Sequence, residues 1–191
     1  PLATDEKATA AAAPQATATP SPKVTTKPQS IGRLPKYSGT PSPVQGRLTD
    51  QTAAITLPRL GGPWRLDLRT EHIRSTYGFT TRQYVAAGTD PTGRPRFAMI
   101  MSGPLSERLA SRYTSPDTLG PVINAVAVVA RRNYFPQGNR AVKTAQQRLT
   151  VNGMPGQLNA YEITAGEQKT TMVVAAVSTG ADLPAIVYMQ V

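Results

Sequence analysis

Short apolar segments separated by turn residues fill the C-terminal part of the chain. They predict strands at residues 147–151, 158–164, 171–177 and 185–191. Asn152-Gly153 separates the first two segments, and both residues tolerate the positive φ that a two-residue hairpin requires. Because turns this short cannot carry a parallel crossover, we expect these strands to form an antiparallel meander.

Further strands are predicted upstream of this meander. Residues 54–57 form an apolar segment that Pro58 should end. Residues 64–69 alternate between apolar and polar side chains, with the period of two that is typical of a half-buried strand. Segments 83–87 and 96–101 flank an Asp-Pro-Thr-Gly turn, so we expect them to form a hairpin.

One long helix is predicted at residues 117–133. Its apolar side chains recur at steps of three and four residues and form one face: Leu119, Val122, Ile123, Val126, Val129 and Ala130. Ser115-Pro116-Asp117 offers an N-cap with proline in the first turn. A second, shorter helix is expected at residues 106–113. These elements predict an α+β fold, an antiparallel β-sheet meander with one or two helices packed on it.

The composition changes near residue 46. The first 46 residues contain 8 of the 18 prolines and one aromatic residue, Tyr37. Proline disfavours helix and sheet, and few large apolar groups are present to offset the entropy of ordering. We therefore expect residues 1–46 to be a disordered Pro/Ala/Thr-rich linker and residues 47–191 to be one folded domain. Such spacers are typical of domains held outside the cytoplasm, so we expect tethering to the cell envelope through an upstream membrane segment absent from this chain.

The charge pattern indicates the kind of partner. The net charge of +10 favours an anionic envelope polymer or a lipid headgroup. Mixed arginine and aromatic residues, which are enriched at interfaces, give the candidate binding residues Arg131, Arg132, Arg140, Tyr134, Phe135, Arg94 and Arg96. No nucleic-acid-binding module can be recognised, so no specific nucleic acid is expected. The arginine excess is also explained by the codon usage of a GC-rich genome.

Little chemistry is available for catalysis. The chain has no cysteine and one histidine, His72, so thiol chemistry is excluded, and no ligand spacing for a metal is recognisable. If residues 64–69 form a strand, Asp67 and Glu71 do not share a face and cannot act as paired carboxylates. We expect no catalytic residue, no metal, no cofactor and no enzymatic activity. Two alternatives stay open: a nucleic-acid-handling accessory of a secretion or transfer apparatus, and an enzyme with an unrecognised site.

Three segments carry a resemblance to a known family: residues 47–50 (Arg-Leu-Thr-Asp), 55–64 (Ile-Thr-Leu-Pro-Arg-Leu-Gly-Gly-Pro-Trp) and 102–105 (Ser-Gly-Pro-Leu). They resemble actinobacterial extracytoplasmic proteins that have one membrane span and a Pro/Ala-rich linker. The order of strand pair, helix and meander is similar to the PsbP-like fold. This resemblance implies a PsbP-like α/β sandwich and a non-enzymatic binding or scaffolding role, with a protein partner or an anionic envelope component as ligand. Such folds usually end in a helix after the last strand, and we expect that helix to be missing here.

Overall fold

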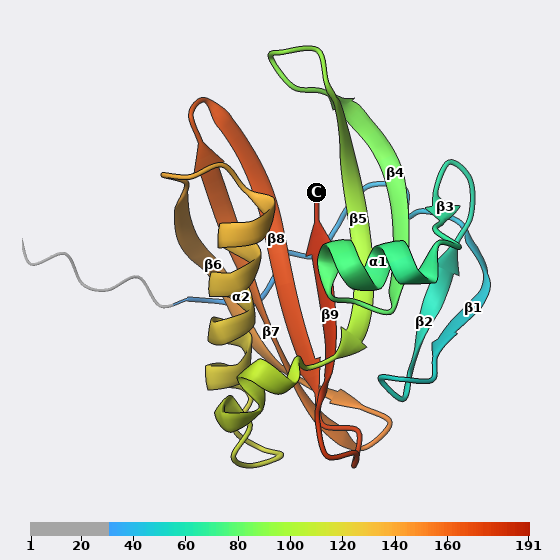
Figure 1. The fold of residues 1–191 in the computed structure, drawn as a ribbon, viewed down its shortest axis with the longest axis vertical. Helices are drawn as coiled ribbons and strands as arrows, with labels where there is room; N and C mark the ends of the chain where they lie inside the picture. The colour runs from blue at the N-terminus through green and yellow to red at the C-terminus, as the bar shows by residue number, and fades with distance from the viewer. Residues whose placement is uncertain (1–30) are drawn as a thin grey trace, which may run out of the picture. The chain divides into compact units, whose positions relative to one another are not determined.

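A seven-stranded antiparallel sheet is the main element of residues 31–191, the part of the chain that the computed structural model describes (Figure 1). In spatial order its strands are β3 (Arg65–Leu66), β4 (Thr81–Thr89), β5 (Pro95–Pro104), β9 (Ala185–Gln190), β8 (Gln168–Val177), β7 (Met154–Ala165) and β6 (Arg140–Val151). A separate hairpin contains β1 (Val44–Asp50) and β2 (Ile55–Leu60). The helices are α1 (Thr70–Tyr77) and α2 (Gly120–Tyr134), with a 3₁₀ helix at Glu107–Arg112. This arrangement confirms the predicted α+β class.

The predicted meander is present as β6 to β9. Each of these strands pairs with the next one in the sequence, and all pairs are antiparallel. Asn152 and Gly153 have φ values of 50° and 79°, so the tight turn between β6 and β7 uses the left-handed conformations that these two residues tolerate. The hairpin predicted around the Asp-Pro-Thr-Gly turn is also confirmed, as β4 and β5.

One face of the sheet is covered by the helices. In Figure 1, α2 lies over β7 and β8, and α1 lies over β5 and β4. The buried face of α2 contains Val122, Ile123, Val126, Ala127 and Ala130. These side chains belong to the same apolar core as the buried residues of the sheet, Met101, Ile163, Met172, Val174, Ile186 and Tyr188. The long helix is therefore confirmed, although it begins three residues later than predicted, with Pro121 in its first turn.

The region around residues 64–69 corrects a prediction. Only Arg65–Leu66 pairs with β4, and Leu68, expected on the inner face, is 81% exposed. The carboxylate of Asp67 accepts a hydrogen bond from the backbone N–H of Arg69 (3.1 Å), which turns the chain away from the sheet. Helix α1 follows, and it buries Ile73 alone, so its sequence lacks a recurring apolar face.

The hairpin of β1 and β2 contributes to the second core. Ile55 and Leu57 pack against a cluster on the sheet made of Ala145, Leu158, Ala160, Val173, Ala175 and Val187. The buried side chain of Gln83 joins the hairpin to β4: it accepts a hydrogen bond from the N–H of Leu60 (2.8 Å) and donates one to the carbonyl of Pro58 (3.0 Å). The prediction that the strand ends at Pro58 is wrong, because this residue lies inside β2. The short helix predicted at 106–113 is a 3₁₀ helix.

Residues 31–43 precede β1, and the first of them contact β6, the edge strand farthest from β3. Gly32 forms a parallel bridge with Ala145 of β6, and its carbonyl accepts a hydrogen bond from the N–H of Gln146 (2.9 Å). The boundary expected at residue 46 falls inside β1, which begins at Val44. Residues 1–30, the remainder of the expected linker, lie outside the described residues.

Candidate binding cleft

A cleft of about 590 Å³ lies between the C-terminal end of α1, the C-terminal half of α2 and the 3₁₀ helix. Its size falls within the range of roughly 300 to 1,000 Å³ that is typical of small-molecule sites. Residues 74–78 form one wall, and Val126 to Tyr134 contribute the other. We refer to it below as the α1–α2 cleft.

Apolar side chains form much of the surface of the α1–α2 cleft. They are Phe79, Leu105, Leu109, Val126, Val129, Ala130 and Ile186. Most of them belong to the main core, whereas Leu109 and Val129 are only half-buried and present apolar atoms to the cleft. A ligand that covered these two side chains would gain about 25 cal/mol for each Å² of apolar surface removed from water.

The polar lining of the α1–α2 cleft is basic. Arg74, Arg108 and Arg132 line it together with hydroxyl and amide side chains, and its lining contains no aspartate, glutamate or histidine. Arg74 is paired with Glu71 at 3.1 Å, but both side chains are largely exposed. Within residues 31–191, neither Arg108 nor Arg132 has a carboxylate within ion-pair distance. The cleft can therefore stabilise a negatively charged group.

A hydrogen bond between two tyrosines fixes the distance between the two helices. The phenol of Tyr134, in the last turn of α2, donates to the carbonyl of Tyr77 at the end of α1 (2.6 Å). Burial raises the pKa of Tyr134 to about 12, so this donor keeps its proton at any physiological pH. The ring of Tyr134 also packs edge-on against Tyr188 of β9, with centroids 5.3 Å apart. The cleft walls are thus held in place from inside.

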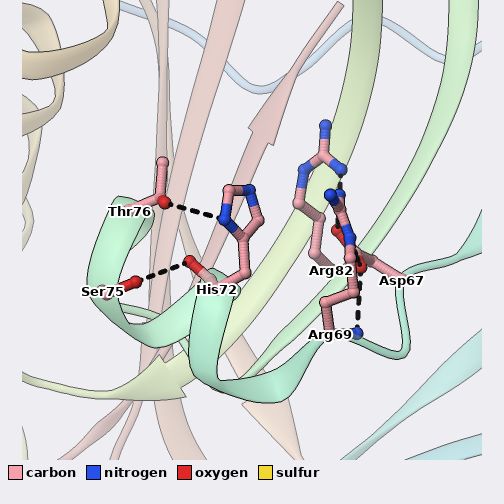
Figure 2. A network of polar contacts seen from close by, with 6 residues as sticks. All are labelled: Asp67, Arg69, His72, Ser75, Thr76 and Arg82. Atoms are coloured by element: carbon pink, nitrogen blue, oxygen red, sulfur yellow. Dashed lines mark hydrogen bonds and ion pairs between the residues drawn. The ribbon is translucent and has the colours of Figure 1, made fainter.

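A buried ion pair between Arg82 and Asp67 lies between α1 and β4. Arg82 of β4 is 5% exposed, and its guanidinium lies over the rings of Tyr84 (4.4 Å) and Tyr77 (5.1 Å). Asp67 accepts hydrogen bonds from Arg69 (2.9 Å) and from Arg82 (3.1 Å), as Figure 2 shows. The hydrogen bond from Arg69, supported by that from Arg82, lowers the pKa of Asp67 to about 2. Asp67 is therefore a structural anion that links Arg69, just before α1, to Arg82 of β4.

His72 lies on the exposed side of α1. Its Nδ1 is 3.3 Å from the hydroxyl of Thr76 (Figure 2). The buried carboxylate of Asp50 accepts hydrogen bonds from Ser102 (2.7 Å) and Thr80, but His72 is not among the partners of this group. Within the described residues, no group of three or more histidine, cysteine, aspartate or glutamate side chains could hold a metal ion.

The structure does not bring the seven residues proposed from the sequence together in one site. Arg132 and Tyr134 line the α1–α2 cleft, and Arg132 also borders a shallower cavity of about 310 Å³ with Arg131 and Phe135. Arg131 is held by Asn139, which accepts hydrogen bonds from its Nε and Nη2 at 2.9 Å each, so it stabilises the turn after α2. Arg140 begins β6 without lining either cavity.

The remaining two predicted residues belong to the β4–β5 hairpin. Arg94 is exposed in its turn, and Arg96 donates a hydrogen bond from β5 to the hydroxyl of Thr170 in β8 (3.2 Å). Neither lines the α1–α2 cleft. Sequence reasoning missed Arg74 and Arg108, which come from α1 and the 3₁₀ helix. No sequence pattern identifies them, because tertiary structure alone brings these segments beside Arg132.

No protein-family model matches the chain, and no curated protein is significantly similar to it in sequence. Among solved structures, the solution structure of cyanobacterial PsbP (CyanoP) from Synechocystis sp. PCC 6803 is similar to this chain. The TM-score is 0.48 and the sequence identity 12%, over 82% of this chain and 85% of that chain. PsbP is the family whose fold the sequence resembles, and this likeness concerns the fold alone.

Proposed function

We propose that this protein is a non-catalytic binding domain of the cell envelope, outside the cytoplasm, and that its α1–α2 cleft holds an anionic envelope component. One observation carries the proposal: Arg74, Arg108 and Arg132 line a cleft that contains no acidic side chain. Within the described residues, Arg108 and Arg132 have no carboxylate partner, and such guanidinium groups favour an anion because hydrogen bonds between charged groups are about twice as strong as neutral ones.

The polar chemistry of the described residues favours binding over catalysis. The exposed His72 contacts Thr76, and the buried Asp67 is neutralised by Arg69 and Arg82. General acid–base catalysis needs a titratable group beside the reacting atoms, and the α1–α2 cleft has none apart from tyrosine and arginine.

The location outside the cytoplasm is supported by composition. The Pro/Ala/Thr-rich first 46 residues are typical of a spacer between a membrane and a folded domain. No helix within residues 31–191 is long and apolar enough to cross a membrane. A segment upstream of residue 1 would supply the anchor in this proposal, and fractionation of cells that express the full gene tests it.

Binding to vesicles tests the proposed function. The full 191-residue chain should bind vesicles that contain phosphatidylglycerol and not pure phosphatidylcholine vesicles. Binding should weaken from 50 to 300 mM salt as the Debye length shortens from roughly 14 to 6 Å.

Two variants relate this binding to the cleft. Arg108→Gln should weaken it about fivefold, since each basic side chain near an anionic surface contributes about 1 kcal/mol. Arg112→Gln is the matched control: Arg112 ends the same 3₁₀ helix but does not line the cleft. Equal losses in the two variants would show that net charge, and not the cleft, determines the binding.

A further inference from the structure

We infer that the ligand of the α1–α2 cleft is a single-chain amphiphile with a monoanionic head, the head against the three arginines and the apolar chain along Leu109 and Val129. This inference rests on the proposed function, because both use the same cleft. It adds the chemical class of the ligand, which can be derived from the charge balance and the lining of the cleft.

The charge balance of the cleft points to a single negative charge. Three guanidinium groups line it, and Glu71 offsets that of Arg74. Both helices that form the walls also present their C-terminal ends there, and each end carries roughly half a negative charge. About one unit of positive charge remains. A monoanion neutralises it, whereas a polyanion would bring excess negative charge against two helix C-termini.

The lining of the cleft points to an apolar chain attached to that anion. Arg108 and Leu109 are adjacent on the 3₁₀ helix, and Val129 and Arg132 are three residues apart on α2, slightly less than one helical turn. Each wall therefore carries a charged side chain next to an apolar one. A soluble anion such as acetate would satisfy the arginines and leave Leu109 and Val129 in water. The apolar chain of an amphiphile would cover both of these side chains while its head contacts the arginines.

The rigidity of the walls supports binding of a small flexible molecule. The Tyr134–Tyr77 hydrogen bond and the Arg82–Asp67 ion pair hold α1 and α2 before any ligand arrives. A site that is already ordered avoids the entropy cost of ordering itself on binding. The ordering cost then falls mainly on the chain of the ligand.

Titration calorimetry with the full 191-residue chain tests the inference with defined probes below their micelle concentrations. Decanoate and a lysophosphatidylglycerol should both bind with one site per chain, and their ratio shows whether a carboxylate or a phosphodiester head is preferred. Decyl maltoside, which has the chain without the charge, and acetate, which has the charge without the chain, should each bind at least tenfold more weakly. Octanoate, which is two CH₂ groups shorter, should bind about 15-fold more weakly than decanoate, because each buried CH₂ changes affinity about fourfold.

Variants assign the binding to the two parts of the cleft. Arg108→Gln should weaken decanoate binding about fivefold and leave decyl maltoside unchanged, with Arg112→Gln as the charge-matched control. Val129→Thr should weaken both probes, with the exposed Val128 replaced by threonine as its control on the same helix. If Val129→Thr unfolds, Ser75→Trp serves instead, because Ser75 is an exposed cleft residue that a large ring would block.

The outcomes separate the two proposals. Vesicle binding that depends on Arg108, together with equal affinity for decanoate and acetate, would overturn the amphiphile and leave the anionic cleft standing. If the wild-type chain binds neither the anionic vesicles nor the amphiphiles, both proposals are wrong. Amphiphile binding that is indifferent to Arg108→Gln and to Ser75→Trp would move the ligand to another surface, and this too would overturn the inference.

Discussion

Arg82 carries its guanidinium into the interior, between the rings of Tyr77 and Tyr84 and against the carboxylate of Asp67. A buried ion pair adds little stability compared with apolar residues of similar size, but loss of one partner leaves an uncompensated charge. The pair therefore restricts which arrangement of α1 on β4 is stable. Since α1 forms one wall of the cleft, Asp67 and Arg82 are positioning residues for the site.

The first prediction concerns this pair. Asp67→Asn should lower the free energy of unfolding by about 3 kcal/mol, because Arg82 stays buried without its anion. Glu71→Gln is the control, since it removes an exposed carboxylate from its pair with Arg74 and should cost less than about 0.5 kcal/mol. Urea denaturation of the two variants measures the difference. Equal midpoints would contradict the structural role of Asp67.

The second prediction follows from the pKa of Asp67, about 2 in the folded protein and about 3.9 in an unfolded chain. A carboxyl group whose pKa is lowered by folding stabilises the protein above its unfolded pKa. This contribution, about 3 kcal/mol, should be present above about pH 4 and disappear as the pH falls toward 2. Urea midpoints of the wild type and Asp67→Asn should converge over this range. A difference that stays constant down to pH 2 would show that Asp67 does not cause it.

At the scale of elements, α2 depends on its buried face. The third prediction is that Val122→Asp lowers the free energy of unfolding by several kcal/mol, because the new carboxylate would lie in the core without a partner. Val128→Asp, on the exposed side of the same helix, should change it by less than about 0.5 kcal/mol. Thermal denaturation followed by circular dichroism measures both, and similar melting temperatures would be incompatible with the packing described.

The attachment of the β1–β2 hairpin gives a fourth prediction. Gln83→Leu should cost about 2 kcal/mol, because the N–H of Leu60 and the carbonyl of Pro58 would lose their partner in a partly buried position. Gln146→Leu, at an exposed position of β6, is the control. Hydrogen exchange at Leu60 should accelerate in the first variant alone. Unchanged exchange there would mean that Gln83 does not hold the hairpin.

The elements that could be predicted from the sequence are those with a recurring local pattern. The meander could be predicted from short apolar segments separated by turn residues, and α2 from apolar side chains that recur at steps of three and four residues. Helix α1 was missed because it buries only Ile73, and its stability comes from contacts with Arg82 and Tyr134. The burial of Asp67 could not be predicted, since its partner Arg82 is 15 positions away in the sequence and no local pattern indicates the pairing.

At the scale of the whole molecule, the candidate site could be predicted only in part. Arg132 and Tyr134 could be identified because arginine and aromatic residues are mixed in that segment. Arg74 and Arg108 lie about 60 and 25 residues away from it in the sequence. The fold brings three segments together, and the site exists only where they meet. The sequence pointed equally to Arg94, Arg140 and Arg132, and only the geometry shows that Arg132 alone of these three lines the cleft.

The most direct test of the central claim, that the α1–α2 cleft is the binding site, is an NMR titration of the ¹⁵N-labelled full chain with decanoate. We expect saturable chemical-shift changes concentrated at residues 74–78, 105–109 and 126–134, with small changes at Arg94 and Arg140. Arg108→Gln should weaken the saturation about fivefold and keep the same pattern. Shifts centred on the β4–β5 hairpin or on β6, or no saturable shifts at millimolar decanoate, would contradict it.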